Sequence, residues 1–469
     1  MSDRLLILGA GPTGLGAAHR LHETGHTDWL LLEASAHAGG LASSVVDDRG
    51  FTWDLGGHVQ FSHYAYFDRL MDDLLGPDGW LHHERESWVW LRDRFVPYPF
   101  QMNLRRLPPD DMKACVAGLV RLYKTPPSGR PADFGAWIDA TFGEGIARVF
   151  MRPYNTKVWA YPPEAMQYSW IGERVAVVDL ERVLANIFDG RDDLSWGPNN
   201  TFRFPKRGGT GSIWRECARR LPAQRVRLGA RVAKVDTAGK TVTLADGETI
   251  AYGRLLNTAP VDEFVRMSDL APELSPLADR LVHSSTHIFG VGLRGAPSSD
   301  VAKKCWMYFP EDDCPFYRVT VFSNYSPENV PDISKHWSLM AEVSESPTKP
   351  VPDTPEERLE EVIQGMLNTK LIASRDDIIS TWQCRLEHGY PTPSLDRDAI
   401  LNELLPALSR RGVDSRGRFG AWRYEVSNQD HSLMQGVEWV NHVLYGADEL
   451  TLWHPEVVND MKRPALRCG

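Results

Sequence analysis

Cysteine is scarce in this sequence, and its spacing matches no common binding pattern. Six cysteines are scattered over 469 residues without a CxxC pair, which argues against a disulfide framework and against a zinc site. Long apolar runs are also missing, because no stretch approaches the roughly 18 uninterrupted apolar residues of a transmembrane helix. The first residues enter a strand-like run at once and lack the layout of a signal peptide. These absences predict a reduced, soluble, cytoplasmic protein without a metal site.

Basic residues are also fewer than acidic residues. The chain has 52 Lys and Arg residues against 62 Asp and Glu residues, so its formal net charge is −10. An acidic surface argues against nucleic acid and anionic membranes as partners, and a polyanionic ligand would need a local basic pocket. The hydrophobic content of 42% and the length are those of a globular protein of two or three domains with a large core.

The N-terminal residues predict a dinucleotide-binding unit. An apolar run at residues 5–8 predicts a buried parallel strand, and Gly9, Gly11 and Gly14 lead from it into a helix over about 13–23. The first glycine permits the turn, the second lets a pyrophosphate approach the backbone, and the third lets the helix pack on the strand. A second apolar strand ends at Glu33, whose carboxylate can accept hydrogen bonds from both ribose hydroxyls. The glycines alone would also fit an ordinary strand–helix turn, but their setting favours a dinucleotide.

The residues after Glu33 resemble a large family of FAD proteins. Gly39 and Gly40 follow Glu33 after five residues, and this E-(x)5-GG arrangement resembles the family of amine oxidases, protoporphyrinogen oxidases and nucleotide-sugar mutases. The segment RGGTG at 207–211 resembles the second glycine segment of that family, and Val232 lies in the strand that contacts the adenine there. The resemblance implies FAD as the cofactor.

Longer stretches narrow the resemblance to one branch of that family. They occur in the family's order along the chain and closely resemble the eukaryotic-type UDP-galactopyranose mutases. The matching stretches are DLGGHVQFSH (54–63), VPYPFQMN (96–103), FMRPYNTKVWA (150–160), GERV (172–175), NNTFRFPKRGGTG (199–211), CWMYFPEDDCPFYR (305–318), HGYPTP (388–393) and RFGAWRYEVSNQDHS (418–432). One position departs, since Ser427 stands where the family has glycine, which puts the turn beside the flavin in doubt.

The resemblance implies an isomerase that interconverts the pyranose and furanose forms of a nucleotide sugar, with UDP-galactopyranose and UDP-galactofuranose as first candidates. Reduced FAD would attack the anomeric carbon through N5, and NAD(P)H would reduce the flavin. Arg85 and Ser87 match positions linked to NADPH binding in the family. The sequence has no convincing Ser-His-Asp, paired-carboxylate or metal constellation, which leaves the cofactor as the source of the chemistry.

Other functions stay open. The same mutase chemistry could act on another sugar or nucleotide after a few substitutions in the pocket. An amine-oxidase-type oxidoreductase would share the glycines and Glu33 but would have no reason to keep Arg174, Arg318, Tyr390 and Tyr424. A non-catalytic flavoprotein could be built from the same motifs.

The family's functional residues map onto this sequence position by position. The resemblance implies a catalytic set of Arg174, Arg318, His58, Tyr390, Tyr424 and Asn199. The implied FAD-binding positions are Gly9, Gly11, Thr13, Gly14, Glu33, Gly40, Leu41, Ser43, Gly56, Gly57, His58, Val232, Asn428, Gln429 and Ser432. The implied substrate-binding positions are Phe61, Tyr98, Phe100, Gln101, Phe150, Asn155, Trp159, Arg174, Asn199, Tyr308, Arg318, Tyr390, Arg418, Tyr424 and Asn428.

Several of these residues have a plainer interpretation. Arg174 and Arg318 offer bidentate donors for a diphosphate, but an arginine can equally be a surface or ion-pair residue. Seen alone, the aromatic residues of VPYPF are more typical of a core than of a base site, and Trp159 can be a helix-packing residue. His58 is predicted to lie beside the flavin and is not assigned as a general base.

The expected fold is α/β. A Rossmann-like, doubly wound FAD-binding domain receives a mainly helical domain and an antiparallel β-sheet domain, with the active site where the three meet. The predicted segments are 1–80, 199–285 and 411–469 for the FAD-binding domain, 105–198 for the helical nucleotide-binding domain, and 81–104 with 286–410 for the β-sheet substrate domain. A homo-oligomer is compatible with the sequence.

Overall fold

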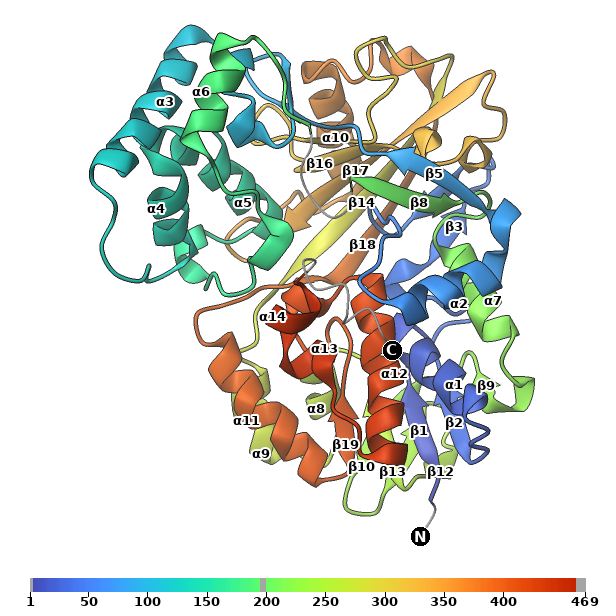
Figure 1. The fold of residues 1–469 in the computed structure, drawn as a ribbon. Coiled ribbons are helices and arrows are strands. Elements are labelled where there is room, and N and C mark those ends of the chain that lie inside the picture. The colour runs from blue at the N-terminus through green and yellow to red at the C-terminus, as the bar shows by residue number, and fades with distance from the viewer. Residues whose placement is uncertain (1–2, 195–199, 461–469) are drawn as a thin grey trace.

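A five-stranded parallel sheet lies in the lower half of the molecule (Figure 1). The computed structural model describes residues 3–194 and 200–460. The strand order is β19-β13-β1-β2-β9, formed by β1 (Leu5–Leu8), β2 (Trp29–Leu32), β9 (Val226–Arg227), β13 (Arg254–Asn257) and β19 (Val413–Ser415). All neighbouring strands in it run parallel. Strands from the two ends and the middle of the chain therefore lie side by side.

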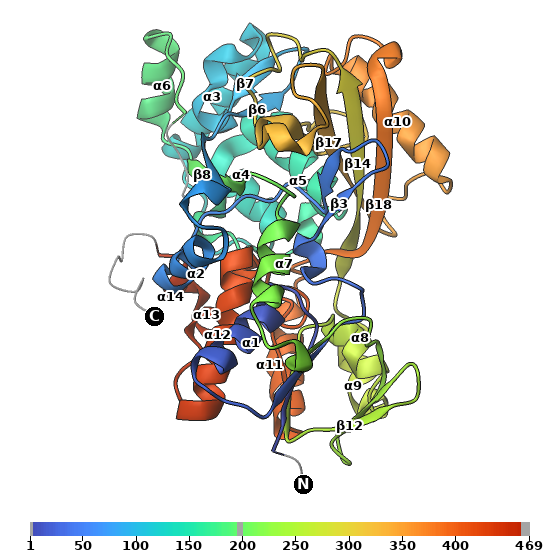
Figure 2. The same ribbon diagram turned by 90° about the vertical axis from the view of Figure 1, so that its right-hand side faces the viewer.

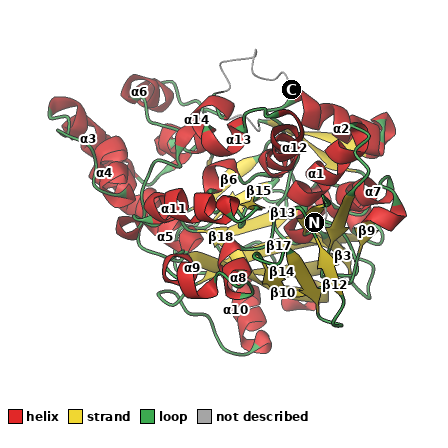
Figure 3. Ribbon diagram, turned by 90° about the horizontal axis from the view of Figure 1, so that it is seen from below, coloured by secondary structure: helices red, strands yellow, loops and turns green. Residues whose placement is uncertain are grey.

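Both faces of this sheet are buried, which explains the uninterrupted apolar sequences of β1 and β2. Leu5 and Ile7 pack on one face in a core shared with α1 (Pro12–Glu23) and α12 (Gln429–Tyr445). Leu6 and Leu8 pack on the other face, in a core shared with α8 (Val261–Arg266), α9 (Ala271–Ala278) and α11 (Arg397–Arg410). Seen from below, the two groups of helices flank the strands (Figure 3). This arrangement confirms the predicted doubly wound fold.

A seven-stranded mixed sheet forms the second large layer, with the order β18-β14-β17-β16-β15-β6-β7. All neighbouring pairs are antiparallel except β15 and β6. The long strands β14 and β18 run side by side with α10 along their flank (Figure 2). The elements are β6 (Ser87–Trp90), β7 (Phe95–Pro97), β14 (His283–Arg294), β15 (Trp306–Tyr308), β16 (Arg318–Val321), β17 (His336–Glu345), β18 (Ile378–Pro391) and α10 (Pro355–Asn368).

A helical layer occupies the upper left of Figure 1 and has its own hydrophobic core. It contains α3 (Pro109–Lys124), α4 (Phe134–Ile146), α5 (Arg152–Trp159) and α6 (Leu180–Phe188), with a π-helical turn, Ala147–Met151, between α4 and α5. The helical domain predicted from the sequence is therefore present. The residue numbers at which the predicted domains begin and end remain predictions.

Short elements connect these three parts. They are α2 (Ala65–Leu75), α7 (Gly211–Arg219), α13 (Leu450–Trp453), α14 (Pro455–Val458), β3 (Ser44–Val46), β4 (Thr52–Asp54), β5 (Trp80–Glu84), β8 (Thr201–Pro205), β10 (Val232–Asp236), β11 (Thr241–Leu244) and β12 (Thr249–Ala251). Asp246 and Gly247 lie in the turn that joins β11 to the antiparallel strand β12. Among the described residues, no helix combines the length and the apolar character needed to cross a lipid bilayer.

Candidate active site

A cavity of about 850 Å³ lies where the three parts of the fold meet. Gly9, Gly11 and Glu33 line it at the carboxyl ends of β1 and β2, where doubly wound sheets bind their ligands. The seven-stranded sheet contributes Arg318, Glu342 and Tyr390 to its wall, and Arg174 comes from the helical part. A single continuous cavity therefore lies at the junction of the three parts, where the sequence predicts the site.

The three glycines of the first turn differ in what surrounds them. Gly9 has a φ of +101°, and a Cβ there would lie 2.3 Å from Thr258 Oγ1. A Cβ on Gly14 would lie 1.9 Å from the carbonyl oxygen of Gly9. A Cβ on Gly11 would lie at least 4.0 Å from every protein atom outside its neighbours in the chain, and Gly11 lines the cavity. Gly9 and Gly14 are thus required by the fold itself, whereas Gly11 leaves room for a ligand at the start of α1.

Glu33 is held in a fixed orientation at the end of β2. Its Oε2 accepts a hydrogen bond from the backbone N–H of Ala10 at 2.7 Å. Its Oε1 accepts from the backbone N–H and the hydroxyl of Ser35 at 2.8 and 2.9 Å. Gly40, Leu41 and Val232 line the same part of the cavity. The turn and the carboxylate together fit the pyrophosphate and ribose of a dinucleotide.

The second glycine segment packs against β3 and β4 rather than on the cavity. The buried carboxylate of Asp54 accepts from the Thr210 backbone N–H at 3.1 Å, and the Ser44 hydroxyl donates to it at 2.5 Å. A Cβ on Gly209 would lie 2.3 Å from Asp54 Oδ1. Burial raises the pKa of Asp54 to about 7.

We expect Asp54→Asn to gain stability relative to wild type as the pH rises. The folded pKa lies above the unfolded value of about 3.9, so the folded state binds more protons between these values. Ionisation of Asp54 therefore lowers the free energy of unfolding as the pH rises from 5 to 8, and asparagine removes that loss. Calorimetric melting temperatures of both proteins at several pH values test this, and a difference that stays flat or falls with pH would contradict it.

The N-terminus of α12 also meets the cavity. Asn428, Gln429 and Ser432 line the cavity there. The amide oxygen of Gln429 accepts from Trp214 Nε1 at 2.7 Å, which fixes the first turn of the helix. Because α12 has 17 residues, its N-terminal N–H groups present a partial positive charge to a ligand in the cavity.

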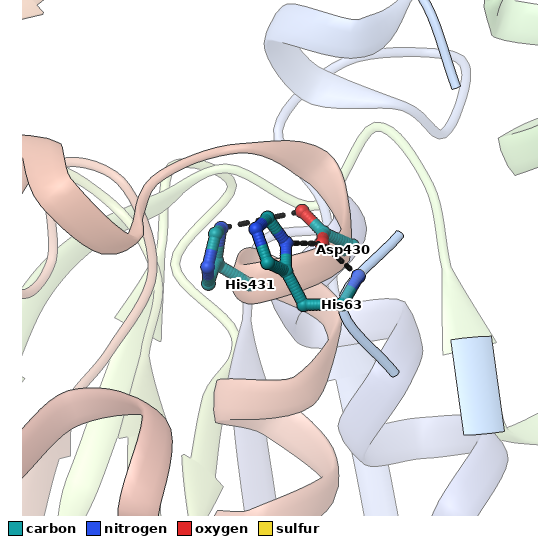
Figure 4. Close-up of side chains that lie close together, drawn as sticks. All are labelled: His63, Asp430 and His431. Carbon is teal, nitrogen blue, oxygen red and sulfur yellow. Dashed lines mark hydrogen bonds and ion pairs between the residues drawn. The ribbon is translucent and has the colours of Figure 1, made fainter. Parts of the chain in front are cut away.

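A buried histidine–aspartate cluster supports this helix end, and the sequence interpretation missed it. Figure 4 shows His63, Asp430 and His431 side by side at the first turn of α12. His63 bonds to Asp430 Oδ2 through its backbone N–H at 3.0 Å and through Nδ1 at 2.7 Å. Burial opposes ionisation of Asp430, but the neighbouring His431 and these bonds hold its pKa well below the usual range. A sequence signal existed, because both histidines stand inside the matching stretches, but spacing alone did not pair them.

Arg174 and Arg418 are cations without a carboxylate partner among the described side chains. Arg174 donates to the Glu425 carbonyl at 2.9 Å and lies 4.9 Å above the Tyr424 ring. Arg418 is engaged by neutral groups only, the Gly389 carbonyl and the Ser427 hydroxyl, each at 2.9 Å. Burial lowers the pKa of the Arg418 guanidinium. Two uncompensated guanidinium groups on one cavity wall favour an anionic ligand.

Arg318 is different, because Glu342 balances its charge. Arg318 Nε and Nη2 donate to the two carboxylate oxygens at 2.7 and 2.8 Å. Burial opposes the ionisation of Glu342, but the guanidinium outweighs it and keeps the carboxyl pKa below its usual range. The sequence interpretation missed Glu342, although a lone carboxylate within a strand that is buried from Trp337 to Ser344 was a possible signal.

The residues expected to bind the substrate line the cavity only in part. Tyr98 and Tyr308 line it, with ring centroids 5.3 Å apart. The positions that do not line it are Phe100, Gln101, Phe150, Asn155 and Trp159. They are buried because they pack in the core of the helical layer or against it. The Gln101 amide donates a hydrogen bond to the carbonyl of Ala176, and the Asn155 amide donates one to the carbonyl of Met151.

The remaining predicted residues are placed as follows. Phe61, Tyr390 and Tyr424 line the cavity, as does Thr13, whereas buried Ser43 does not. The Trp159 ring packs edge-on against Tyr424 at 4.8 Å, which fits the helix-packing interpretation and also steadies that tyrosine. Asn199 lies outside the described residues.

His58 lies on the cavity in the loop of Gly56 and Gly57. Burial, together with the nearby Arg418 and Arg318, lowers the pKa of His58 to about 4 although Glu342 opposes the shift. Its Nδ1 is buried and has no hydrogen-bond partner among the described residues. At neutral pH the side chain is therefore an uncharged imidazole on the cavity wall.

We expect the His58 ring to stay neutral from pH 5.5 to 8. The resonances of its ring nitrogens, observed by NMR in protein labelled with ¹⁵N-histidine and assigned by loss in His58→Asn, should not shift over this range. Since the folded pKa lies below the unfolded value of about 6.5, this group lowers the free energy of unfolding as the pH falls toward 4. Protonation with a midpoint near 6.5 would contradict the assignment.

Comparison with known proteins gives two kinds of similarity. The sequence profile of flavin containing amine oxidoreductases matches residues 12–287. The crystal structure of a reduced UDP-galactopyranose mutase superposes with a TM-score of 0.94 at 50% sequence identity, covering 98% of each chain.

More distant structures share the fold alone. A putative protoporphyrinogen oxidase from Exiguobacterium sp. 255-15 has a TM-score of 0.69 at 17% identity, covering 92% of this chain and 98% of the other. A putrescine oxidase has a TM-score of 0.62 at 16% identity, covering 95% and 99%. The fold is thus shared by enzymes of different chemistry, and the site must carry the functional argument.

Proposed function

Because the chain belongs to the UDP-galactopyranose mutase family within the flavin containing amine oxidoreductases, we propose that it is a flavin-dependent mutase. It interconverts UDP-galactopyranose and UDP-galactofuranose. The observation that carries the proposal is the cavity that joins a dinucleotide turn at Gly11 to the uncompensated guanidinium groups of Arg174 and Arg418. One half of the cavity fits a flavin dinucleotide, and the other fits a diphosphate.

FAD fits the residues present. Gly11 leaves space for the pyrophosphate, Glu33 is oriented for the ribose, and the N-terminus of α12 faces the cavity with Asn428 and Gln429. When bound and reduced, FAD would supply the nucleophile N5 for the anomeric carbon of the sugar. Neutral His58 and the Gly56–Gly57 turn would lie beside it and exclude water.

The arginines act on the charge that develops during the reaction. When the bond between the anomeric carbon and the phosphate oxygen breaks, the leaving diphosphate gains one negative charge. Arg174 and Arg418 can stabilise this charge because no described carboxylate competes for them. Arg318 holds the diphosphate through the donors that Glu342 leaves free.

The tyrosines serve as neutral donors around the sugar and the diphosphate. Tyr308, Tyr390 and Tyr424 line the cavity. Burial and the neighbouring Glu342 raise the pKa of Tyr390, although Arg318 opposes the shift, so its hydroxyl keeps the proton. Held close to the sugar, these hydroxyls keep the displaced diphosphate in place for the return step.

The proposal also covers the reductant of the flavin, the cellular location and the oligomeric state. NAD(P)H as reductant is supported by Arg85, which lines the cavity 5.5 Å above the Tyr98 ring, whereas Ser87 is buried on β6 and does not line the cavity. A cytoplasmic location is supported by the five free cysteines among the described residues. Self-association stays a prediction.

The test is chromatography of UDP-galactofuranose incubated with dithionite-reduced protein, with oxidised protein as the control. We expect UDP-galactopyranose to form only with the reduced protein. No conversion by protein that holds FAD and binds UDP would point to another sugar. Failure to bind UDP as well would overturn the assignment of the diphosphate site, and hydrogen peroxide formation with an amine would support an oxidoreductase instead.

A further inference from the structure

The carboxylate of Glu342 accepts from four donor groups, which belong to two parts of the chain, the Gly57 loop and the adjacent residues Tyr317 and Arg318. Oε1 accepts from the Gly57 backbone N–H at 3.1 Å and from Arg318 Nε at 2.7 Å. Oε2 accepts from Arg318 Nη2 at 2.8 Å and from the Tyr317 hydroxyl at 2.7 Å. A carboxylate offers about four acceptor sites, so this one is fully used. The Glu342 side chain is 2% exposed, and water cannot readily replace a lost donor.

The shared Oε1 joins the loop beside the flavin site to the expected diphosphate clamp. A Cβ on Gly57 would lie 3.0 Å from Oε1 and 3.3 Å from Cζ of Arg318, so the backbone of the loop packs directly on this ion pair. A displacement of the guanidinium therefore displaces the carboxylate, and the carboxylate displaces the Gly57 N–H. The loop and Arg318 cannot move independently while all four bonds are kept.

A ligand at Arg318 will disturb this arrangement. The guanidinium has five N–H donors, and Glu342 takes only Nε–H and one N–H of Nη2. The others are available to a diphosphate in the cavity that Arg318 lines. The negative charge of such a ligand competes with Glu342 for the same guanidinium and weakens its hold on Oε1.

We propose that Glu342 is a positioning residue that couples diphosphate binding at Arg318 to the Gly56–His58 loop and hence to the flavin environment. The inference rests on the proposed function, which supplies the diphosphate and the flavin. Because coupling between two ligands is reciprocal, the flavin loop also adjusts the affinity of Arg318 for the diphosphate.

The test compares holoprotein variants in their response to UDP. The UDP dissociation constant is measured by calorimetry, and the flavin absorption spectrum is recorded at saturating UDP. In wild type we expect UDP to change the spectrum. In Glu342→Gln we expect most of that change to be lost while UDP binds about tenfold more tightly, because the competing carboxylate charge is removed. A merely structural role would weaken UDP binding instead.

Two further variants complete the experiment. Glu345→Gln is the matched control. Glu345 is also on β17 and pairs with Arg385 at 2.8 Å, but it does not pair with Gly57 or Arg318. This variant should respond to UDP as wild type does. Gly57→Ala forces the loop away from the ion pair without removing either charge, and should lose the spectral change with UDP affinity near wild type. Gly57→Ala decides the question if Glu342→Gln does not fold.

The outcomes separate this proposal from the proposed function. A full spectral response in Glu342→Gln or Gly57→Ala, or weaker UDP binding in Glu342→Gln, would overturn the coupling. If wild type converts UDP-galactofuranose but UDP leaves its flavin spectrum unchanged, the coupling fails and the mutase assignment stands. If wild type neither converts the sugar nor binds UDP, both fail.

Discussion

Arg174→Ala should lower kcat/KM for UDP-galactofuranose by about 100- to 1000-fold, the range typical for loss of a preorganised group that stabilises charge in the transition state. Arg174 lies on the cavity wall, supported by the Glu425 carbonyl and the Tyr424 ring, with no described carboxylate to share its charge. Most of the loss should appear in kcat, because the diphosphate carries more negative charge after the sugar leaves than before. Steady-state kinetics of the reduced protein measure both parameters, and flavin content should stay at the wild-type level.

Arg130→Ala is the matched control for this variant. Arg130 also lies over a tyrosine ring, that of Tyr168, at 5.8 Å, and donates to its hydroxyl, but neither residue lines the cavity. Its activity should equal that of wild type. Arg174→Lys should recover part of the lost rate, since lysine keeps the charge but not the planar fork. Equal activity in Arg174→Ala and wild type would remove Arg174 from the site.

The dinucleotide half of the molecule was predictable from short-range sequence signals. The apolar run at 5–8, the glycine turn and the strand ending at Glu33 depend on residues that are close in the chain, and the structure places them as β1, the turn and β2. Burial on both faces imposes a continuous apolar run, which is visible in sequence without any alignment. The inserted helical layer was predicted as well, since a helical pattern is also a short-range signal.

The electrostatic partners in the site were not predictable in this way. Glu342 and Arg318 are on adjacent antiparallel strands, and their pairing depends on the register of β16 with β17. His63 and Asp430 are 367 residues apart, and only the packing of α12 on the first domain brings them together. The sequence showed that arginines were present at these positions. Only the fold showed that Glu342 neutralises Arg318, whereas Arg174 and Arg418 have no described carboxylate partner.

Ser427, which stands where the family has glycine, makes hydrogen bonds in the structure that a glycine could not make. The sequence alone placed it in a turn beside the flavin and left its effect open. In the structure its hydroxyl accepts from Arg418 and donates to the Tyr424 carbonyl, both at 2.9 Å. A glycine could not make either bond. The serine therefore helps to orient a buried cation that lacks a described carboxylate partner.

Gly11→Val should produce a folded protein that binds FAD about 100-fold more weakly, or purifies without it. Gly11 has extended backbone angles, φ −76° and ψ −178°, which valine adopts readily. Apart from its neighbours in the chain, no protein atom lies closer than 4.0 Å to a Cβ placed on Gly11. The side chain would therefore project into the space proposed for the pyrophosphate. The flavin content of the purified protein and its recovery on titration with FAD measure the effect.

Gly14→Ala separates a ligand effect from a folding effect in the same turn. Its Cβ would lie 1.9 Å from the Gly9 carbonyl oxygen, a backbone atom that cannot move aside easily, so this variant should lose about 1–3 kcal/mol of stability even without flavin. Gly11→Val should instead melt at the temperature of flavin-free wild type. Gly11→Val protein that purified with a full complement of FAD would contradict the placement of the dinucleotide against Gly11, since the cofactor would then not need the space that this glycine leaves.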